Sequence, residues 1–428
     1  MGLCHGILSH PSHGPELTHQ TFGNGSRCVF APMPDAGLTC LDFWCRAGSA
    51  FEQKGEEGLA HFLEHMVFKG SRQLGAGDFD RRIEALGGSS NAATGFDDVH
   101  FHVLVPPEGA CEALELLLDL VLEPALRADA YGMERDVVLE EIAQYRDQPD
   151  EQVVQHLLAS SCANHPYGRP ILGWEESLLA SSPDTMAAFH QRRYRGTNCC
   201  LMVAGAIPKG LEQTISASRL ASLATQSEDH PNGIDQTLSF QRGRDTIQVE
   251  RLEAARLLMA WPAAAADQQH QVMGIDLATT LLAEGRRSRL VERLREELQI
   301  VESIDMDLTT LEQGSLVMLE ACCPAEHIEE VEAEVDRVLQ ECASTPVQAA
   351  EMERGRQLVG NGLRFSLEAP GSVAGIAGPQ ALWREPQDPL RPLQDLQNWT
   401  AAGLQSDVFG QLQASKAFTL VALPEEEG

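Results

Sequence analysis

The sequence predicts an α+β protein with two homologous domains. Strand-like and helical periods alternate in the first half of the chain, and a weaker copy of the same succession follows a polar segment at residues 221–240. The 428 residues, 43% of them hydrophobic and 22% charged, suffice to build more than one core. We therefore expect an N-terminal domain over residues 1–220, a linker over 221–240 and a C-terminal domain over 241–428.

The first domain is expected to begin with strands. Apolar and polar positions alternate over residues 27–50, which indicates a half-buried sheet. Helical spacing follows, and strand and helical patterns then alternate up to a buried strand near residue 200. In chain order these later elements are a helical stretch at Gly55–Gly70, a strand region at Gly95–Val105, helices at Cys111–Leu122 and Tyr131–Arg146, and a strand at Leu201–Pro208.

The second domain repeats this order weakly. Strand-like Thr246–Trp261 precedes helical patterns at Met273–Ala283 and Arg286–Leu298. The chain then closes with a strand at Phe418–Leu423 before Pro424, which resembles the strand near residue 200. The two halves are therefore expected to be homologous.

Charge and composition exclude several classes of partner. The chain has 32 Lys and Arg against 63 Asp and Glu, so its net charge is −31. Such a surface repels polyanions, so we expect no nucleic-acid partner and no membrane partner. An acidic interior would instead favour cationic substrates. No signal-like segment or long apolar run is present, and eleven scattered cysteines form no CxxC pair. The sequence thus predicts a soluble, cytoplasmic protein.

The string HFLEH at residues 61–65 carries the clearest chemical signal. On a helix, His61 and His65 lie one turn apart on the same face with Glu64 beside them. Two imidazoles can then bind one ion while a carboxylate points at its open position, as in zinc peptidases with the order H-x-x-E-H. The alternative is an ordinary helix that happens to carry these residues. A catalytic zinc usually has three protein ligands, so a third is expected elsewhere.

The corresponding positions of the second half lack metal ligands. Aligning Leu59–Ala60 with Leu277–Ala278 places Thr279, Leu282 and Ala283 where the first half has the motif. Metal chemistry is therefore expected in the first half alone.

The motif resembles the pitrilysin/insulysin family of metallopeptidases, the inverzincins, which includes the mitochondrial processing peptidases and their bacterial relatives. That resemblance implies a third ligand in a pattern present here as ERDVVLEEI, residues 134–142. The matching residue is Glu141, whereas the neighbouring Glu140 more simply faces solvent. Glu134 resembles the family carboxylate that orients a ligand imidazole. The resemblance implies one zinc per chain. A His₂Glu ligand set also favours zinc over manganese or cobalt.

A second string, GGSSNAAT at residues 87–94, resembles a family stretch on a sheet edge that pairs with the substrate backbone. Asn91 and Ala92 are then the expected substrate-binding residues, although without the family the string indicates only a turn. His100 and His102 share one face of the following strand, and a structural role is favoured over metal binding for them.

The resemblance implies a zinc-dependent endopeptidase that hydrolyses unfolded peptides or oligopeptides. Zinc polarises the scissile carbonyl, and Glu64 accepts a proton from water and returns it to the leaving amine. It also implies a fold of two domains, each a mixed, mostly antiparallel sheet covered by helices, which together form half of a clamshell.

The second half departs from the family pattern L-R-E-x-x-G-x-x-Y. Arg295 matches the catalytic Arg, but Gln299 holds the Gly position and Glu302 the Tyr position. An ionised carboxylate cannot donate a hydrogen bond to an oxyanion. We therefore expect a heterodimer with a homologous subunit that supplies an Arg/Tyr pair, or else a homodimer. The change at Glu302 also allows a weakly catalytic or non-catalytic scaffold subunit, or a tolerated surface substitution.

Overall fold

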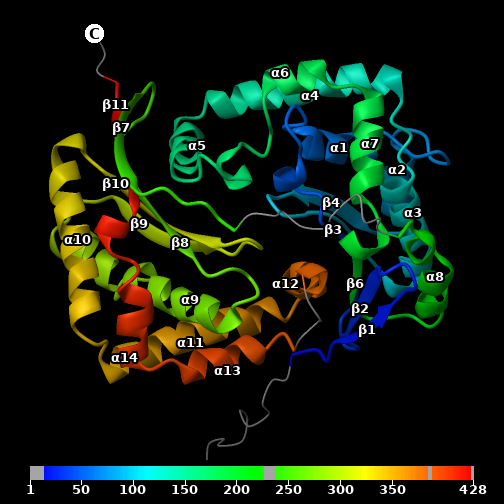
Figure 1. The fold of residues 1–428 in the computed structure, drawn as a ribbon. Coiled ribbons are helices and arrows are strands. Elements are labelled where there is room, and N and C mark those ends of the chain that lie inside the picture. Colours follow the sequence, from blue (N-terminus) through cyan, green and yellow to red (C-terminus); the bar gives the residue numbers. More distant parts are fainter. Residues whose placement is uncertain (1–13, 226–236, 384–387, 426–428) are drawn as a thin grey trace, which may run out of the picture.

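The computed structural model describes residues 14–225, 237–383 and 388–425, which form two α+β halves lying side by side (Figure 1). Each half has one mixed, mostly antiparallel sheet with helices packed on it, as the sequence predicts. Part of the expected linker, residues 226–236, lies outside the described residues. The described parts of that segment, 221–225 and 237–240, lie in the chain between the helix Leu211–Ala217 and the strand Gly243–Val249.

Within the described residues, the first sheet has the strand order β1-β2-β6-β3-β5-β4 and the second has the order β7-β11-β8-β10-β9. In chain order the strands are β1 (Thr18–Thr21), β2 (Arg27–Pro32), β3 (Thr39–Cys45), β4 (Ser89–Thr94), β5 (Val99–Val105), β6 (Cys199–Gly205), β7 (Gly243–Val249), β8 (Ala255–Ala263), β9 (Ser303–Thr309), β10 (Ser315–Cys323) and β11 (Phe418–Pro424).

The α-helices lie around the two sheets (Figure 1). Those of the first half are α1 (Leu59–Val67), α2 (Asp78–Ala85), α3 (Ala110–Leu122), α4 (Ala128–Arg146), α5 (Pro149–Ser161), α6 (Glu175–Ala180), α7 (Pro183–Arg193) and α8 (Leu211–Ala217). Those of the second half are α9 (Gln269–Ala283), α10 (Ile328–Ser344), α11 (Ala349–Ser366), α12 (Pro370–Trp383), α13 (Arg391–Asn398) and α14 (Ala401–Gly403).

The two sheets repeat one topology. β2 runs parallel to β6, and β7 runs parallel to β11. The remaining neighbours are antiparallel in both sheets, in the matching orders β6-β3-β5-β4 and β11-β8-β10-β9. Helix α9 therefore takes the place in the second half that α1 takes in the first, and it carries the buried Thr279, Leu282 and Ala283.

Several expected elements have different bounds. The segment Thr246–Trp261 is two strands, β7 and β8, and β11 lies between them in the sheet. A turn separates them, in which Arg251 has a left-handed φ of 60°. β5 begins only at Val99, because Gly95 donates its N–H to the Asp98 carbonyl in a tight turn. Within 286–298 the regular structure is a π-helix, η6 (Val291–Glu297).

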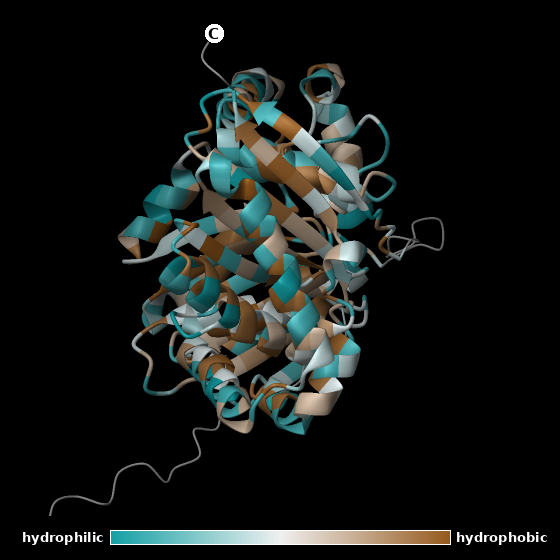
Figure 2. Ribbon diagram, turned by 90° about the vertical axis from the view of Figure 1, so that its left-hand side faces the viewer, coloured by the Kyte–Doolittle hydropathy of each residue, from teal (hydrophilic) through white to brown (hydrophobic). Residues whose placement is uncertain are grey.

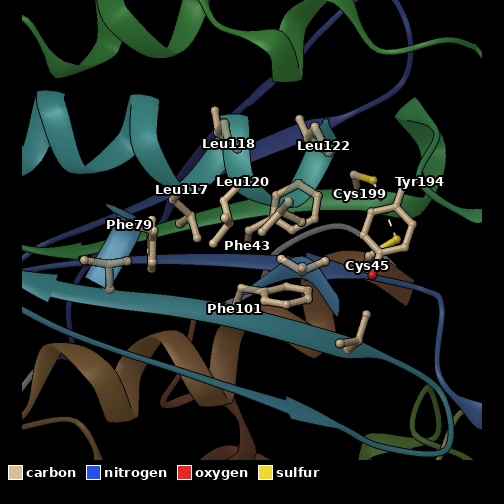
Figure 3. Close-up of a cluster of buried hydrophobic side chains, with 14 of the residues drawn as sticks. Phe43, Cys45, Phe79, Phe101, Leu117, Leu118, Leu120, Leu122, Tyr194 and Cys199 are labelled. Carbon is tan, nitrogen blue, oxygen red and sulfur yellow. Dashed lines mark hydrogen bonds between the residues drawn. The ribbon is translucent and has the colours of Figure 1, made fainter. Parts of the chain in front are cut away.

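The core of the first half lies between its sheet and helices α1 and α3 (Figure 3). Phe43 and Phe101 project from adjacent strands β3 and β5, and Leu117 and Leu120 project from α3. All four side chains are essentially buried. Full burial of such a side chain contributes about 1.5–3 kcal/mol. This packing fixes the sheet beneath α1, the helix with the HFLEH string.

The other face of each sheet is covered by a helix from the opposite half. α12 of the second half packs on β2, β3 and β6, where its Val373 and Ala377 contact a cluster with Trp44 and Met202. α5 of the first half packs on β7, β8 and β11 through Val153 and other apolar residues. Figure 1 shows α12 beside the first sheet and α5 beside the second. The halves are thus joined by an exchange of helices.

Membrane-spanning helices and disulfides are both absent from the part of the chain that the structure describes. Among the described helices, none combines the length and apolar character that crossing a membrane requires. Every cysteine in the described ranges is a free thiol. Figure 2 shows hydrophobic residues on several strands and mixed colours along the surrounding helices, as expected for helices with one buried side.

The contact between α12 and the first sheet gives a stability prediction. A Cβ at Gly378 would lie 2.2 Å from Trp44 Nε1, so Gly378→Ala overpacks this contact and should lower the free energy of unfolding by about 1–3 kcal/mol. Gly375 is exposed on the same helix, and a Cβ there would have no described atom within 4 Å. Gly375→Ala should therefore raise that free energy by about 0.5–1 kcal/mol. Urea unfolding measures both, and shifts of the same sign would contradict the packing argument.

Candidate metal centre

Helix α1 starts at a tight backbone contact. Its N-cap, Gly58, has φ +92°, and a Cβ there would lie 2.4 Å from the Leu172 carbonyl oxygen. Gly173 faces it with φ +78°, and a Cβ at Gly173 would lie 2.2 Å from Gly58. Only glycines fit this crossing. The loop around residue 173 therefore fixes where the helix with the HFLEH string begins.

A buried carboxylate caps the same helix. Glu52 accepts hydrogen bonds from the backbone N–H of Gly58, at 3.1 Å, and of Ala60, at 2.8 Å. These donors have no partner within the helix, and a negative group at a helix N-terminus is favourable. Glu52 is only 6% exposed, so burial raises its pKa to about 8 against the opposing pull of these N–H groups.

The composition of α1 decides which way its histidines face. Phe62, Leu63 and Met66 are fully buried against the core. Phe62 also packs against Tyr131 of α4, with ring centroids 4.6 Å apart. The half-buried His61 and His65 occupy the remaining face, with ring centroids 4.7 Å apart. The apolar residues thus turn the two imidazoles toward α4.

Helix α4 brings the third predicted ligand to them. Glu141 Oε2 lies 3.7 Å from His61 Nε2 and 3.5 Å from His65 Nε2. One donor atom from each of the three residues lies within 4.8 Å of the other two. Two imidazole nitrogens and one carboxylate oxygen suit zinc, so the cluster fits the ion that the sequence predicts. Glu140 is exposed on the same helix and is not one of this group.

The state of the imidazoles also suits a metal. Burial lowers the pKa of His61 to about 4, and the neighbouring His65 acts in the same direction. His61 is therefore neutral near pH 7, with a nitrogen lone pair free for a cation. A metal ligand must lose its proton before it binds, and here burial has already removed it.

Glu134 orients the second histidine. Its Oε1 lies 2.9 Å from His65 Nδ1, so the ring donates from Nδ1 and its Nε2 lone pair faces Glu141. The other oxygen, Oε2, lies 2.6 Å from Lys69 Nζ. Glu134 is only 8% exposed, and this pair of contacts balances its charge. Glu134 thus contacts one of the two predicted imidazole ligands and a lysine at the same time.

Glu64 lies outside the group of donors and contacts the sheet edge instead. Its Oε2 accepts a hydrogen bond of 2.5 Å from Thr94 Oγ1, the last residue of β4. Burial raises the pKa of Glu64 above its usual range, while the Thr94 hydroxyl opposes that change. A carboxyl group with raised pKa next to a metal site is suited to proton transfer.

The predicted substrate-binding residues lie on β4, which is an edge strand of the first sheet. Asn91 is exposed there, and its Oδ1 accepts a hydrogen bond from the Ala92 N–H at 2.9 Å. The stretch that local pattern alone indicates as a turn is a strand over Ser89–Thr94. An edge strand offers unpaired backbone groups to an extended peptide.

Arg295 and Glu302 lie in the second half and are not among the residues gathered at His61. Arg295 pairs with its neighbour Glu296 at 3.0 Å. Glu302 is exposed and accepts a weak hydrogen bond from Cys322 Sγ at 3.6 Å. Gln299, at the position where the family has Gly, has a left-handed φ of 57°. The backbone therefore keeps the glycine-like turn although the side chain differs.

Three contacting residues were not among the site residues predicted from the sequence: Glu52, Lys69 and Thr94. Thr94 is the final Thr of the GGSSNAAT string, so its position in that motif was a usable signal. Lys69 follows His65 by four residues, just past the end of α1, and this spacing of one helical turn was a usable signal. Glu52 gave no local signal, because its capping role depends on a loop that returns to the helix start.

The fold and this cluster together define a metallopeptidase-like protein, and comparison with known proteins agrees. Residues 38–175 match the family model of insulinase, peptidase family M16, and residues 181–359 match that of the peptidase M16 inactive domain. The chain belongs to the M16 peptidase family, as the HFLEH and ERDVVLEEI strings imply.

Curated relatives have the same family character. An uncharacterized zinc protease of Rickettsia bellii is 27% identical over 345 residues, covering 81% of this chain and 82% of that protein. The uncharacterized zinc protease YmxG of Bacillus subtilis is 25% identical over 363 residues, covering 83% and 86%.

Solved structures share the fold. A protease from Helicobacter pylori superposes with a TM-score of 0.87 at 22% identity, covering 96% of this chain and all of that one. A Pseudomonas fluorescens structure titled as a peptidase M16 inactive domain gives a TM-score of 0.86 at 17% identity, covering 96% and 98%.

The contact between Glu134 and His65 predicts a loss of metal affinity. Glu134→Gln weakens the orienting hydrogen bond and leaves Lys69 without its counter-charge, so zinc affinity should fall about 10- to 100-fold. Glu140→Gln is the matched control, because Glu140 is exposed six residues further along the same helix. Competition with a chromogenic chelator measures both variants. Equal affinities for the two would contradict the orienting role of Glu134.

Proposed function

We propose that this protein is a zinc-dependent endopeptidase that hydrolyses unfolded peptides or oligopeptides. The observation that supports it best is the placement of Glu64, a carboxyl group beside a His₂Glu cluster and hydrogen-bonded to an edge strand. At this site His61, His65 and Glu141 would together hold one zinc ion. The relatives named as zinc proteases support this reading.

The substrate is an extended peptide that adds to β4 as a further strand. Backbone groups of β4 near Asn91 and Ala92 pair with it, so binding reads the peptide backbone more than its side chains. Because Thr94 ends β4 and bonds to Glu64, the same strand positions both the substrate and the proton-transfer group. Folded proteins lack a free extended segment and are excluded from this edge.

The residues of the cluster divide the work of hydrolysis. A zinc ion held by His61, His65 and Glu141 would supply Lewis acidity toward the scissile carbonyl and the attacking water. Glu64 accepts the proton of the attacking water and delivers it to the leaving amine. Glu134 keeps His65 in the tautomer that ligation requires, and Thr94 holds Glu64 in place.

Replacing Glu64 tests this division. Glu64→Gln keeps an oxygen that can accept the Thr94 hydrogen bond but cannot take a proton, so kcat should fall at least about 100-fold. Zinc content should stay at the wild-type value, since Glu64 is not a ligand. Fluorogenic peptide cleavage and elemental analysis give the two readouts.

The Glu140→Gln variant serves again as control and should cleave at the wild-type rate. Chelation should abolish wild-type activity and added zinc should restore it. Undiminished turnover by Glu64→Gln would contradict the role of Glu64 in proton transfer. Turnover that is insensitive to chelator would contradict the role of zinc. Bound zinc without turnover, even after a homologous chain with an Arg/Tyr pair is added, would instead favour the non-catalytic scaffold subunit, for which Glu302 at the Tyr position is the supporting observation.

We further propose that the active unit contains a second, homologous chain. In this chain Arg295 is paired with Glu296, and Glu302 offers no proton donor when ionised. Helix α4 also exposes two apolar side chains one turn apart, Met133 at 67% and Val137 at 49%. Both side chains lie on the helix of the proposed ligand Glu141, where a second chain would bury them. A partner with an Arg/Tyr pair completes the site from outside, and a homodimer is the alternative.

Mixing experiments test the partner proposal. Peptide cleavage by this chain alone should be low and should rise when a homologous chain with the Arg/Tyr pair is added, with both chains co-sedimenting as a heterodimer. Sedimentation of the chain alone as an active dimer would favour the homodimer. Full activity from a monomer would contradict a second chain.

A further inference from the structure

The first sheet has a second group of metal-type donors, on the face opposite to α1. Strands expose alternate residues to alternate faces. Leu41 and Phe43 of β3 belong to the core under α1 and α3, whereas Cys40 and Trp44 belong to the cluster under α12. Asp42 therefore shares the α12 face.

His100 and His102 of β5 lie on the same face. Asp42 is the direct cross-strand partner of His102, and Trp44 that of His100. The Trp44 and His100 rings stack at 4.1 Å with an interplanar angle of 12°. The centroids of the two histidine rings lie 5.7 Å apart. Both rings lie near the Asp42 carboxylate.

The donor atoms of these three residues converge. One atom from each of Asp42, His100 and His102 lies within 4.8 Å of the other two. Asp42 Oδ1 lies 3.0 Å from His100 Nδ1. Two ligands of a tetrahedral ion with bonds of about 2.0–2.1 Å lie about 3.3 Å apart, so this spacing needs only a small adjustment. Without a metal, a proton occupies the space between the two atoms.

The position is rigid on one side and open on the other. Asp42 is 2% exposed on a strand with neighbours on both sides, whereas the His100 side chain is 21% exposed. A carboxylate fixed in the sheet and a partly exposed imidazole give an ion both an anchor and a route of entry. A purely structural role needs only the Asp42–His100 hydrogen bond and does not account for the third donor, His102.

We propose that Asp42, His100 and His102 form a second metal site, which binds zinc or a similar divalent first-row transition ion. Two imidazoles and one carboxylate are the donors that such ions prefer. The ion ties β3 to β5 across the sheet. His100 and His102 are also the register partners of Ala93 and Asn91, so the ion stiffens the strand to which the edge strand β4 is attached.

Metal counting separates this site from the one on α1. After dialysis against Zn²⁺ and removal of free ion, the wild type should hold two zinc ions per chain by elemental analysis. Asp42→Asn and His102→Asn should each hold one, and His65→Asn should also hold one. The double variant with His65→Asn and His102→Asn should hold none. Asp42→Asn keeps a hydrogen-bond acceptor for His100, so it guards against loss of the fold.

Tryptophan fluorescence gives a second readout that needs no activity. In the His65→Asn background, Co²⁺ bound beside His100 lies next to the Trp44 ring and should quench its emission with a stoichiometry of one ion per chain. His102→Asn or Trp44→Phe in that background should abolish the saturable quenching. His327→Asn, at the partly exposed start of α10, is the matched control and should change neither readout.

One zinc per chain in the wild type would overturn the proposal, and so would unchanged metal content in both Asp42→Asn and His102→Asn. Because these counts are made without substrate, they stand or fall independently of peptidase activity. Loss of turnover in Glu64→Gln with two zinc ions bound would be consistent with both proposals.

Discussion

The exchange of α5 and α12 between the halves is the contact on which the rest of the structure depends. These helices occupy corresponding places in the repeat, each directly after the long helix α4 or α11, and each packs on the other half's sheet. α4 ends at Arg146 and α5 begins at Pro149, so docking α5 on the second sheet fixes the end of α4 that carries Glu141. The geometry of the group formed by His61, His65 and Glu141 therefore depends on the second half. A separately expressed first half would lose both this anchor and the cover of its own sheet.

Burial gives the cluster its chemistry. The apolar face of α1 determines the direction of the histidines, and the same burial keeps His61 neutral. It also raises the pKa of Glu64, so that one physical cause prepares both a ligand and a proton acceptor. Lys69 balances the negative charge of Glu134 at the edge of this group, because an unpaired buried carboxylate would lower the stability of the fold. The direction of the two imidazoles, the neutral state of His61 and the raised pKa of Glu64 are thus consequences of where the helix packs.

The residues of the candidate site were easier to predict from the sequence than the surrounding packing that holds them in place. His61, Glu64 and His65 lie within five residues, and helical spacing alone places them together. Glu141 and Glu134 were found only through the family pattern, since no local rule joins helices so far apart in the chain. The α+β class and the repeat followed from periodicity, but the segment 246–261 proved to be two strands with β11 between them. Long-range packing sets the strand order, the exchange of helices and the approach of Asp42 to His102. A single sequence gives no direct signal for any of these three features.

The covering of the first sheet by α12 also has a consequence for biosynthesis. The strands of that sheet are all translated once Gly205 leaves the ribosome, but α12 follows only at Pro370–Trp383. During that interval the nascent chain presents Trp44, Met202 and their apolar neighbours to solvent or to any chaperone near the exit tunnel. The first half is therefore completed by a helix that is translated more than 150 residues later, and a chain cut between these points would expose this apolar surface and tend to aggregate.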